Sequence, residues 1–223
     1  MMDYEILYKD AYLLLCQKPQ GMPSQPDPSG QLDLLTALQQ QFPKAALVHR
    51  LDTPTGGVML YSLSEQATGK LSALVQDHNL FTKEYLCVTA QPLNEPSGEM
   101  IDLLFHDKRK NKAFVVDKKR GGSKEAKLSY QTLAVNEQGN ALVKVRLYTG
   151  RTHQIRVQFA SRGIPLLGDG KYGSRVKMPY IALWSYRAAF THPITKKRIE
   201  VSCMPNQDAL PWSQFDLTAA ERK

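Results

Sequence analysis

The stretch His49-Arg50-Leu51-Asp52-Thr53-Pro54-Thr55-Gly56-Gly57 sets one carboxylate in a turn between two short apolar runs. These runs, Ala45 to Val48 and Val58 to Leu63, are bounded by turn-forming residues, which is typical of strands. An aspartate at such a junction can be presented to a substrate by the rigid elements on either side. Asp and Thr side chains in turns also commonly close the loop by bonding to the backbone. Taken alone, the stretch leaves both interpretations open.

Apolar patterning on both sides of this stretch predicts more strands than helices. Three- and four-residue spacing predicts helices over Leu32 to Phe42, Ser64 to His78 and Thr152 to Arg162. Because many strands are joined by short turns and not by helices, we expect an α+β fold with a mixed, largely antiparallel β-sheet core and a few packed helices. The other expected strands are Tyr4 to Tyr8, Tyr12 to Gln17, Phe81 to Thr89, Leu128 to Val135, Leu142 to Tyr148, Ile181 to Phe190 and Arg198 to Ser202.

The length of 223 residues fits one domain with a substantial core. No internal repeat or long linker divides the sequence, so we expect a single domain over residues 1–212. Within it, a basic hairpin or insertion is expected at about 105–127. The polar tail at 213–223 is expected to fray.

The composition predicts a cytoplasmic protein that does not contact membranes. No apolar run approaches the roughly 20 residues needed to span a bilayer, and the first residues lack a secretory pattern. The cysteines, Cys16, Cys87 and Cys203, are odd in number, far apart and set in apolar stretches. This spacing suits reduced core thiols better than disulfides or a zinc site.

Basic residues are in excess, and most of the excess lies in one segment. The net charge is +8 and the isoelectric point about 9.3. Residues 107–127 hold nine basic and three acidic residues, an excess of six positive charges. A charge run is usually a solvated loop, and a solvated basic hairpin is also a suitable clamp for the phosphates of a nucleic acid.

A second unusual segment runs from Thr149 to Val157 with the sequence TGRTHQIRV. Gly150 ends a strand and Thr152 can cap the helix that follows, which places His153 and Arg156 on one face. Two arginines and a histidine at a helix start favour an anion site. The histidines of the chain show no metal-ligand spacing, so no metal is expected. A phosphate site alone remains an alternative.

Together the two segments resemble the RluA-type family of RNA pseudouridine synthases. The family's HRLDxxTSG signature corresponds to His49 to Gly57, and its TGRTHQIR signature to Thr149 to Arg156. The match spans roughly Asp3 to Val201, with no S4-type RNA-binding domain ahead of it. Four shorter family elements, KPxG, KxY, GD…YG and FxHP, are matched in order by Lys18 to Gly21, Lys83 to Tyr85, Gly168-Asp169 with Tyr172-Gly173, and Phe190 to Pro193.

The resemblance implies the pseudouridine synthase fold and the isomerisation of specific uridines in structured tRNA or rRNA. It also implies that Asp52 is the catalytic carboxylate, Tyr85 the active-site tyrosine and Arg156 the ion-pair partner of Asp52. The isomerisation exchanges no electrons or groups with a donor, so no cofactor is expected. A carboxylate acting as nucleophile or base is sufficient for this chemistry.

A uridine within a folded stem must be flipped out before it can react. Arg50 is the expected wedge, His49 is expected to brace the turn, and Ile155 to line the pocket floor. We expect the protein to act as a monomer. The remaining residues expected to contact RNA are Lys83, Lys108, Arg109, Lys110, Arg151 and His153.

Two other functions compete with this one. The first is a non-catalytic RNA-binding protein on the same scaffold, in which Asp52 is structural. The second is a small-molecule phosphate-binding enzyme that uses Arg151 and Arg156. The chain also departs from the family at Gly56, where serine is usual, and we expect this glycine to loosen the turn behind Asp52.

Overall fold

The computed structural model describes residues 4–222, which contain eleven strands, three α-helices and three short 3₁₀ helices. The chain forms two compact units. The first comprises the chain up to Lys83 together with Trp184–Pro205, and the second comprises Glu84–Leu183 with the chain from Asn206. One catalytic domain over residues 1–212 stays a prediction, and its first three residues lie outside the described part.

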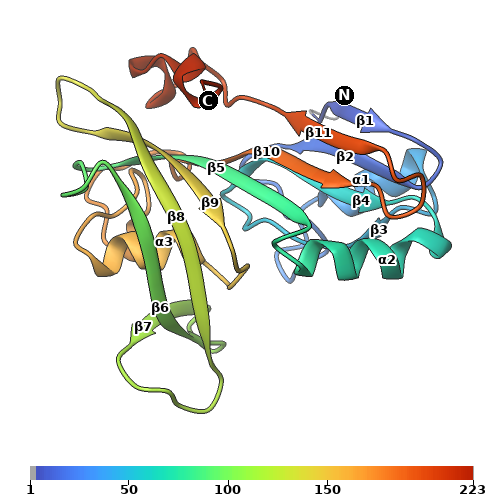
Figure 1. Ribbon diagram of the computed structural model, residues 1–223, viewed down its shortest axis with the longest axis horizontal. Helices are drawn as coiled ribbons and strands as arrows, with labels where there is room; N and C mark the ends of the chain where they lie inside the picture. Colours follow the sequence, from blue (N-terminus) through green and yellow to red (C-terminus); the bar gives the residue numbers. More distant parts are fainter. Residues whose placement is uncertain (1–3, 223) are drawn as a thin grey trace. The chain divides into compact units, whose positions relative to one another are not determined.

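The first unit is built on a mixed sheet (Figure 1). Its pairings are antiparallel except for one parallel contact, in which Trp184 and Ser185 lie opposite Gly56 and Gly57. The strands follow the order β1-β2-β4-β10, with β11 paired to β10 and β3 to β4. Their bounds are β1 Ile6–Lys9, β2 Leu13–Lys18, β3 Ala46–Leu47, β4 Gly56–Ser62, β10 Leu183–Thr191 and β11 Arg198–Ser202.

Two helices, α1 (Leu34–Gln41) and α2 (Glu65–Gln76), accompany this sheet. Asp33 caps α1, because its carboxylate accepts a hydrogen bond from the Thr36 backbone N–H at 3.0 Å. The apolar stripe of α2 packs on β4 and shares a core with residues of β2, β5 and β10 (Figure 1). The core residues of this cluster include Ala67, Leu71 and Leu74 from the helix and Leu13, Leu60, Phe81 and Phe190 from the strands.

The second unit holds an antiparallel sheet in the order β5-β9-β8-β6-β7. Helix α3 (Gln154–Ser161) packs against β6 and β7 (Figure 1). The basic segment at 105–127 comprises the end of β6, all of β7 and the start of β8. The strand bounds are β5 Phe81–Thr89, β6 Ser97–Asp107, β7 Lys112–Val116, β8 Ser123–Val135 and β9 Ala141–Leu147.

The predicted fold class is therefore confirmed: the sheet is mixed and largely antiparallel, and the helices are few. The strands predicted at 81–89 and 198–202 have the observed bounds, and the other predicted strands differ by up to five residues at an end. Strand β6 was not predicted as a separate strand. Periodicity identifies a strand more reliably than it identifies where the strand ends, because the terminal residues are set by partners elsewhere in the chain.

Two local expectations were wrong. The tail was expected to fray, but it forms 3₁₀ helices η2 (Trp212–Gln214) and η3 (Leu217–Ala220) with Trp212 and Leu217 buried. Lys144 Nζ donates to the Ala220 carbonyl at 3.2 Å and fastens this end. Residue 223 lies outside the described part.

The second concerns α3, which was expected to begin at Thr152 with that residue as its cap. The helix begins after His153, whose φ of 54° places it in the left-handed region. All six residues from Gln154 to Phe159 are buried, so the helix does not have one polar and one apolar face.

None of the helices within residues 4–222 has both the length and the apolar character that crossing a membrane requires. The three cysteines are free thiols, and Cys16 and Cys87 are buried. Burial raises the pKa of the Cys16 thiol to about 12, so this group stays protonated in the core.

Candidate functional site

The Asp52 turn is held in place by the KPxG stretch, Lys18 to Gly21, which begins at the last residue of β2, and by the loop that follows. Within the turn, the Asp52 carbonyl accepts a hydrogen bond from the Thr55 N–H at 2.9 Å. The Gly21 N–H donates to the Thr53 carbonyl at 2.9 Å, and Gln20 Nε2 donates to the Pro54 carbonyl at 2.9 Å. Two motifs that are separate in the sequence therefore form one backbone assembly around Asp52.

Lys18 is the central residue of this assembly. Its side chain is fully buried, and its ammonium donates to the carbonyls of Pro19 (2.9 Å), Met22 (2.6 Å) and Thr53 (3.1 Å). These three acceptors match the three donors of an ammonium group. Burial lowers the pKa of Lys18 to about 7, and the negative charge of Asp52 acts in the opposite direction. Lys18 was not among the predicted site residues, although its KPxG element pointed to this position.

The residue before Asp52 is fastened as well. Ser24 Oγ donates to the Leu51 carbonyl at 2.8 Å and accepts from the Leu51 N–H at 3.2 Å. The Ser24 carbonyl in turn accepts from the Tyr61 hydroxyl of β4 at 3.0 Å. The loop after β2 therefore holds the backbone on the N-terminal side of Asp52.

His49 and Lys83 lie in the same unit and make contacts that brace it. His49 Nε2 accepts a hydrogen bond from the Leu60 N–H of β4 at 3.1 Å. Burial and the nearby Lys83 charge hold the pKa of His49 well below its usual range, so the ring is neutral. Lys83 Nζ donates to the Val75 carbonyl near the end of α2 at 3.1 Å, and burial lowers the pKa of Lys83 to about 8. Arg50, in contrast, is exposed.

Gly56 does not loosen the turn as expected, because a tryptophan ring fills the space beside it. A Cβ atom added at Gly56 would lie 2.3 Å from Trp184 Cζ3 and 2.8 Å from Gln20 Cγ. The indole is itself fixed, since its Nε1 donates to the Cys203 carbonyl at 2.7 Å. At Gly57, φ is 112° and an added Cβ would lie 2.1 Å from the Ser185 carbonyl oxygen. Both glycines allow β4 and β10 to approach closely.

In the second unit, the segment before α3 is closed by the side chain of Gln154. Its Oε1 accepts from Thr149 Oγ1 at 2.7 Å and from the Arg151 N–H at 3.0 Å. Its Nε2 donates to the Lys127 carbonyl of β8 at 3.1 Å. Gln154 thus closes the turn that precedes α3, and no side chain in the described part of the chain caps the helix itself.

Tyr172 links this helix start to the basic hairpin. Its hydroxyl lies 2.9 Å from His153 Nδ1 and accepts a hydrogen bond from the Ala113 N–H of β7 at 2.8 Å. His153 is buried, and its role as an RNA contact stays a prediction. Its observed role is to join α3 to 3₁₀ helix η1 (Gly170–Tyr172).

Arg156 forms a buried, two-pronged ion pair with Asp169. Arg156 Nε lies 2.7 Å from Asp169 Oδ2, and Nη2 lies 2.9 Å from Oδ1. Both side chains are at most 5% exposed. The guanidinium carbon also lies 5.1 Å from the centre of the Tyr172 ring. A planar guanidinium held by a carboxylate and an aromatic face has one defined orientation.

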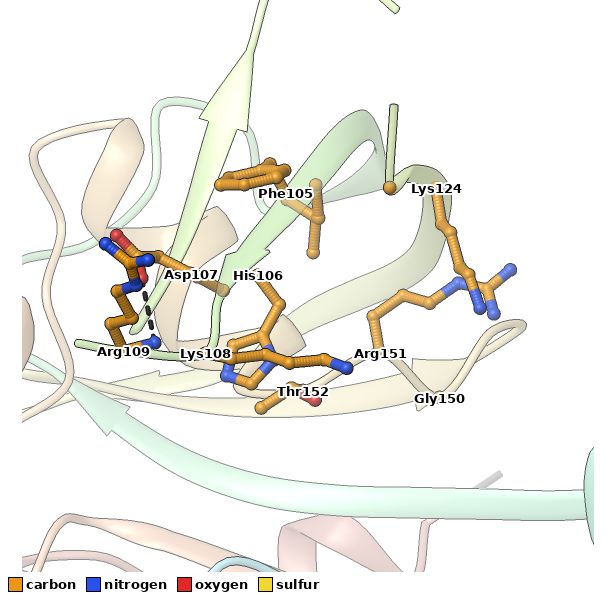
Figure 2. A pocket seen from close by; sticks show the side chains of 12 residues that line it. Phe105, His106, Asp107, Lys108, Arg109, Lys124, Gly150, Arg151 and Thr152 are labelled. Atoms are coloured by element: carbon orange, nitrogen blue, oxygen red, sulfur yellow. Dashed lines mark hydrogen bonds between the residues drawn. The ribbon is translucent and has the colours of Figure 1, made fainter. Parts of the chain in front are cut away.

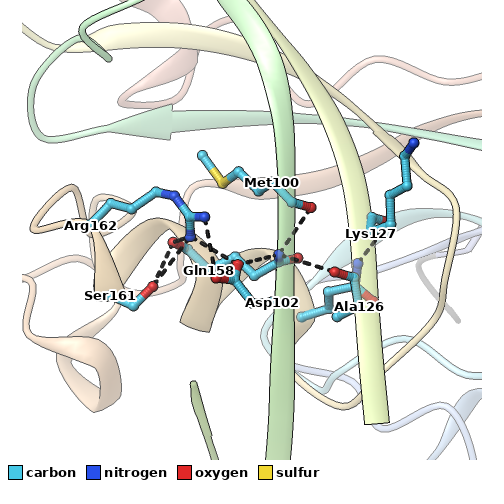
Figure 3. Close-up of polar contacts among 8 residues, drawn as sticks. Met100, Asp102, Ala126, Lys127, Gln158, Ser161 and Arg162 are labelled. Carbon is cyan, nitrogen blue, oxygen red and sulfur yellow. Dashed lines mark hydrogen bonds and ion pairs between the residues drawn. The ribbon is translucent and has the colours of Figure 1, made fainter. Parts of the chain in front are cut away.

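The opposite side of α3 is fixed by a polar network around Gln158 (Figure 3). The fully buried Gln158 donates through Nε2 to Asp102 Oδ2 at 2.6 Å and to the Met100 carbonyl at 3.3 Å. Arg162 Nη1 donates to the same Asp102 oxygen at 2.9 Å. Because Met100 and Asp102 belong to β6, the network holds the helix against that strand.

The other predicted site residues of the second unit include both buried and exposed side chains. Tyr85 lies opposite Val145 in the β5–β9 pairing and is buried, as is Ile155. Arg151 is half-buried, and its Nε donates to the Glu125 carbonyl at 2.8 Å. The exposed hairpin residues are Lys108, Arg109 and Lys110.

The predicted site residues are thus divided between the units: His49, Arg50, Asp52 and Lys83 belong to the first, and the others to the second. Their joint role in one active site stays a prediction. Within residues 4–222, no group of three or more His, Cys, Asp or Glu side chains is arranged as a metal site.

The motifs seated on this framework match a known family. The model of the family described as RNA pseudouridylate synthase matches residues 12–161, more than half of the chain. The chain belongs to the RNA pseudouridylate synthase family. The matched range contains the KPxG stretch, the Asp52 turn, Tyr85 and α3.

Curated relatives in this pseudouridylate synthase family cover most of the chain. The dual-specificity RNA pseudouridine synthase RluA of Yersinia pestis is 31% identical over 194 residues, which are 84% of this chain and 92% of the relative. The ribosomal large subunit pseudouridine synthase D of Pseudomonas aeruginosa is 34% identical over 190 residues, 81% of this chain and 57% of the relative.

Two solved structures share the fold of this pseudouridylate synthase. Human RNA pseudouridylate synthase domain containing 1 has a TM-score of 0.78 at 21% identity, over 94% of this chain and 86% of that chain. Human RNA pseudouridylate synthase domain containing 4 has a TM-score of 0.73 at 23% identity, over 90% of this chain and 88% of that chain.

We predict that Gly56→Ser, which restores the serine usual in the family, destabilises this family member. The new Cβ would overlap the Trp184 ring, and overpacking of this kind costs about 1–3 kcal/mol. Urea denaturation should show the loss. In the double variant Gly56→Ser/Trp184→Val, the added serine should cost less than it does beside the native tryptophan. Equal costs in both backgrounds would show that the indole does not restrict this position.

We predict that Asp169→Asn destabilises the protein far more than the loss of an exposed ion pair does. Removing one charge of a buried, hydrogen-bonded ion pair typically costs about 3–5 kcal/mol. The matched control is Glu200→Gln, which removes the Arg187 partner at 54% exposure and should cost about 0–1 kcal/mol. Similar unfolding midpoints for the two variants would contradict the central role given to the Arg156–Asp169 pair.

Proposed function

We propose that this protein is an RNA pseudouridine synthase that isomerises specific uridines in structured tRNA or rRNA, with Asp52 as the catalytic carboxylate. The observation that carries the proposal is the fixed Asp52 turn, held by Lys18 and Gln20 within a chain of this family. A turn that only connects two strands does not require a buried ammonium bonded to its backbone.

The reaction breaks the bond between uracil N1 and ribose C1′, turns the base and forms a bond from C5 to C1′. The hydrogen on C5 is released as a proton and N1 gains one, so atoms and electrons balance within the nucleotide. Asp52 supplies the nucleophile or base that these steps need. The Lys18 ammonium donates to the carbonyl of the next residue, Thr53, and so helps to fix the backbone that carries the carboxylate.

Tyr85 and Arg156 have proposed roles that complement this carboxylate. The ring of Tyr85 stacks on the uracil and its hydroxyl assists a proton transfer. Arg156 supplies positive charge to the reacting groups, and the ion pair with Asp169 supports this role because it orients the guanidinium before substrate binds.

The remaining residues serve RNA binding in this proposal. The exposed Arg50 acts as the wedge that replaces the flipped uridine, since its planar head can stack on bases. The hairpin residues Lys108, Arg109 and Lys110 neutralise phosphates. Ile155 lines the floor under the uracil. We further propose that the protein acts as a monomer in the cytoplasm, as expected from the sequence.

We predict that Asp52→Asn abolishes isomerisation and leaves RNA affinity nearly unchanged. The amide is isosteric but is neither a nucleophile nor a base, so activity should fall by at least about 10²–10⁴-fold. Tritium release from [5-³H]uridine-labelled RNA, taken from cells that lack the gene, measures the reaction. The exposed Asp208→Asn is the matched control and should retain full activity. Equal release by Asp52→Asn and the control would exclude a catalytic Asp52.

We predict that replacing Lys108, Arg109 and Lys110 together by glutamine weakens RNA binding and flattens its salt dependence. Losing up to three phosphate contacts should reduce the slope of log K against log salt by about 2–3. The matched control is the triple glutamine variant of Lys196, Lys197 and Arg198, an exposed basic run in the first unit. If both triple variants keep the slope of the unmodified protein, the hairpin is not a phosphate clamp.

A further inference from the structure

The second unit contains a pocket of about 740 Å³ between the basic hairpin and the segment before α3 (Figure 2). Leu104 to Arg109 of β6 and the hairpin turn form one wall, and Gly150 to Thr152 form the other. Ala113, Gly122 and Lys124 complete the lining. All of these residues belong to the second unit. The volume lies within the range of sites that bind small ligands or single nucleotides.

The pocket carries a strong positive charge. Four cationic side chains line it, and Figure 2 shows Lys124 and Arg151 at one side with Lys108 reaching between them and Arg109. Asp107 is the acidic residue of the lining, and its Oδ1 already accepts the backbone N–H groups of Arg109 and Lys110 at 3.0 and 3.1 Å. The occupant that fits these cations is an anion.

The pocket also offers an aromatic surface and apolar lining residues. The Phe105 ring borders it, and the Arg120 guanidinium carbon lies 3.8 Å from the centre of that ring, which holds it in position. The buried Leu104 and Ala113 add apolar side chains to the lining. Nucleobases stack on aromatic rings and on guanidinium planes, whereas a phosphate alone gains nothing from them.

We propose that this pocket binds a single unpaired nucleotide of the RNA substrate, other than the target uridine. Its phosphates lie against Lys108, Lys124 and Arg151, and its base packs on Phe105. A base inside a pocket cannot remain stacked in a helix, so the nucleotide is unpaired. Asp52, at which the isomerisation is proposed to take place, is not among the residues that line this pocket.

This inference rests on the proposed function, since it takes RNA as the substrate, and it narrows the substrate class. The preferred RNA presents an unpaired nucleotide in addition to the target uridine, as an RNA with a loop or a bulge does. A continuous duplex would engage the cations only through its backbone and would leave Phe105 without a base.

Two full-length variants, Phe105→Ala and Lys124→Gln, test the proposal by fluorescence anisotropy. The probes are a labelled single-stranded RNA hexamer of mixed sequence and a blunt RNA duplex. Phe105→Ala should weaken hexamer binding by roughly 5- to 100-fold, as the loss of one stacked base does, and leave duplex binding unchanged. Lys124→Gln should weaken the binding of both probes, and the exposed Lys197→Gln should weaken neither.

Phe105→Leu keeps the apolar volume of the ring and removes its flat face. It should therefore fold like the unmodified protein and still bind the hexamer less tightly. Ultraviolet cross-linking of a hexamer that contains 5-bromouridine gives a second readout, with the cross-linked peptide expected to include residues 104–109.

Three results would overturn the proposal. One is a hexamer affinity that is the same for the unmodified protein and Phe105→Ala. Another is an equal loss for hexamer and duplex, which would identify a clamp for phosphates only. A third is displacement of the hexamer by AMP at equal concentration, which would identify a free nucleotide as the occupant.

Tritium release and hexamer binding together show whether the pocket, the isomerase function or both are wrong. If the unmodified protein releases no tritium from any RNA but binds the hexamer through Phe105, the pocket stands and the isomerase function fails. If tritium release is intact and Phe105→Ala binds the hexamer normally, only the pocket fails.

Discussion

Compensation of buried positive charge is the constraint on which the rest of this structure depends. An ammonium or guanidinium that leaves water must find full compensation inside the protein. Lys18 donates to two carbonyls of the loop that follows it and to the distant Thr53 carbonyl, and Arg156 pairs with Asp169. Each cation therefore gathers chain segments that have no local reason to meet. Lys18 helps to hold the Asp52 turn, and the Arg156–Asp169 pair joins α3 to the residue before 3₁₀ helix η1.

Much of the fold could be predicted from the sequence, because alternation and turn signals are local properties of the chain. The strand over Phe81–Thr89 and the helix capped by Asp33 follow directly from such signals. The start of α3 could not be predicted in this way. Thr152 has a good capping side chain, but His153 is drawn into a left-handed conformation beside Tyr172, which lies outside any local window.

In the candidate site, too, some residues can be identified from local sequence and others only from their partners in the folded chain. The motifs identified Asp52, Tyr85 and Arg156 by resemblance, but they gave no role to Lys18, Asp169 or Gln158. These residues act through partners that only the folded chain brings near. Gly56 makes the point most clearly, because the expected looseness is cancelled by the Trp184 ring, contributed by a strand far along the chain. The effect of Gly56 on the turn therefore depends on Trp184, which lies outside the HRLD motif.

The hydroxyl of Tyr172 joins the base of the basic hairpin, at Ala113, to the residue that begins α3. The tip of that hairpin is exposed and makes its own turn through Asp107. Evolution can therefore lengthen, shorten or recharge the tip without disturbing the helix that carries Arg156. A shift of one residue in the register of β7, in contrast, would remove the Ala113 N–H from its acceptor. The register of β7 is therefore tied to the helix that carries Arg156, whereas the turn at the hairpin tip is held by its own hydrogen bonds.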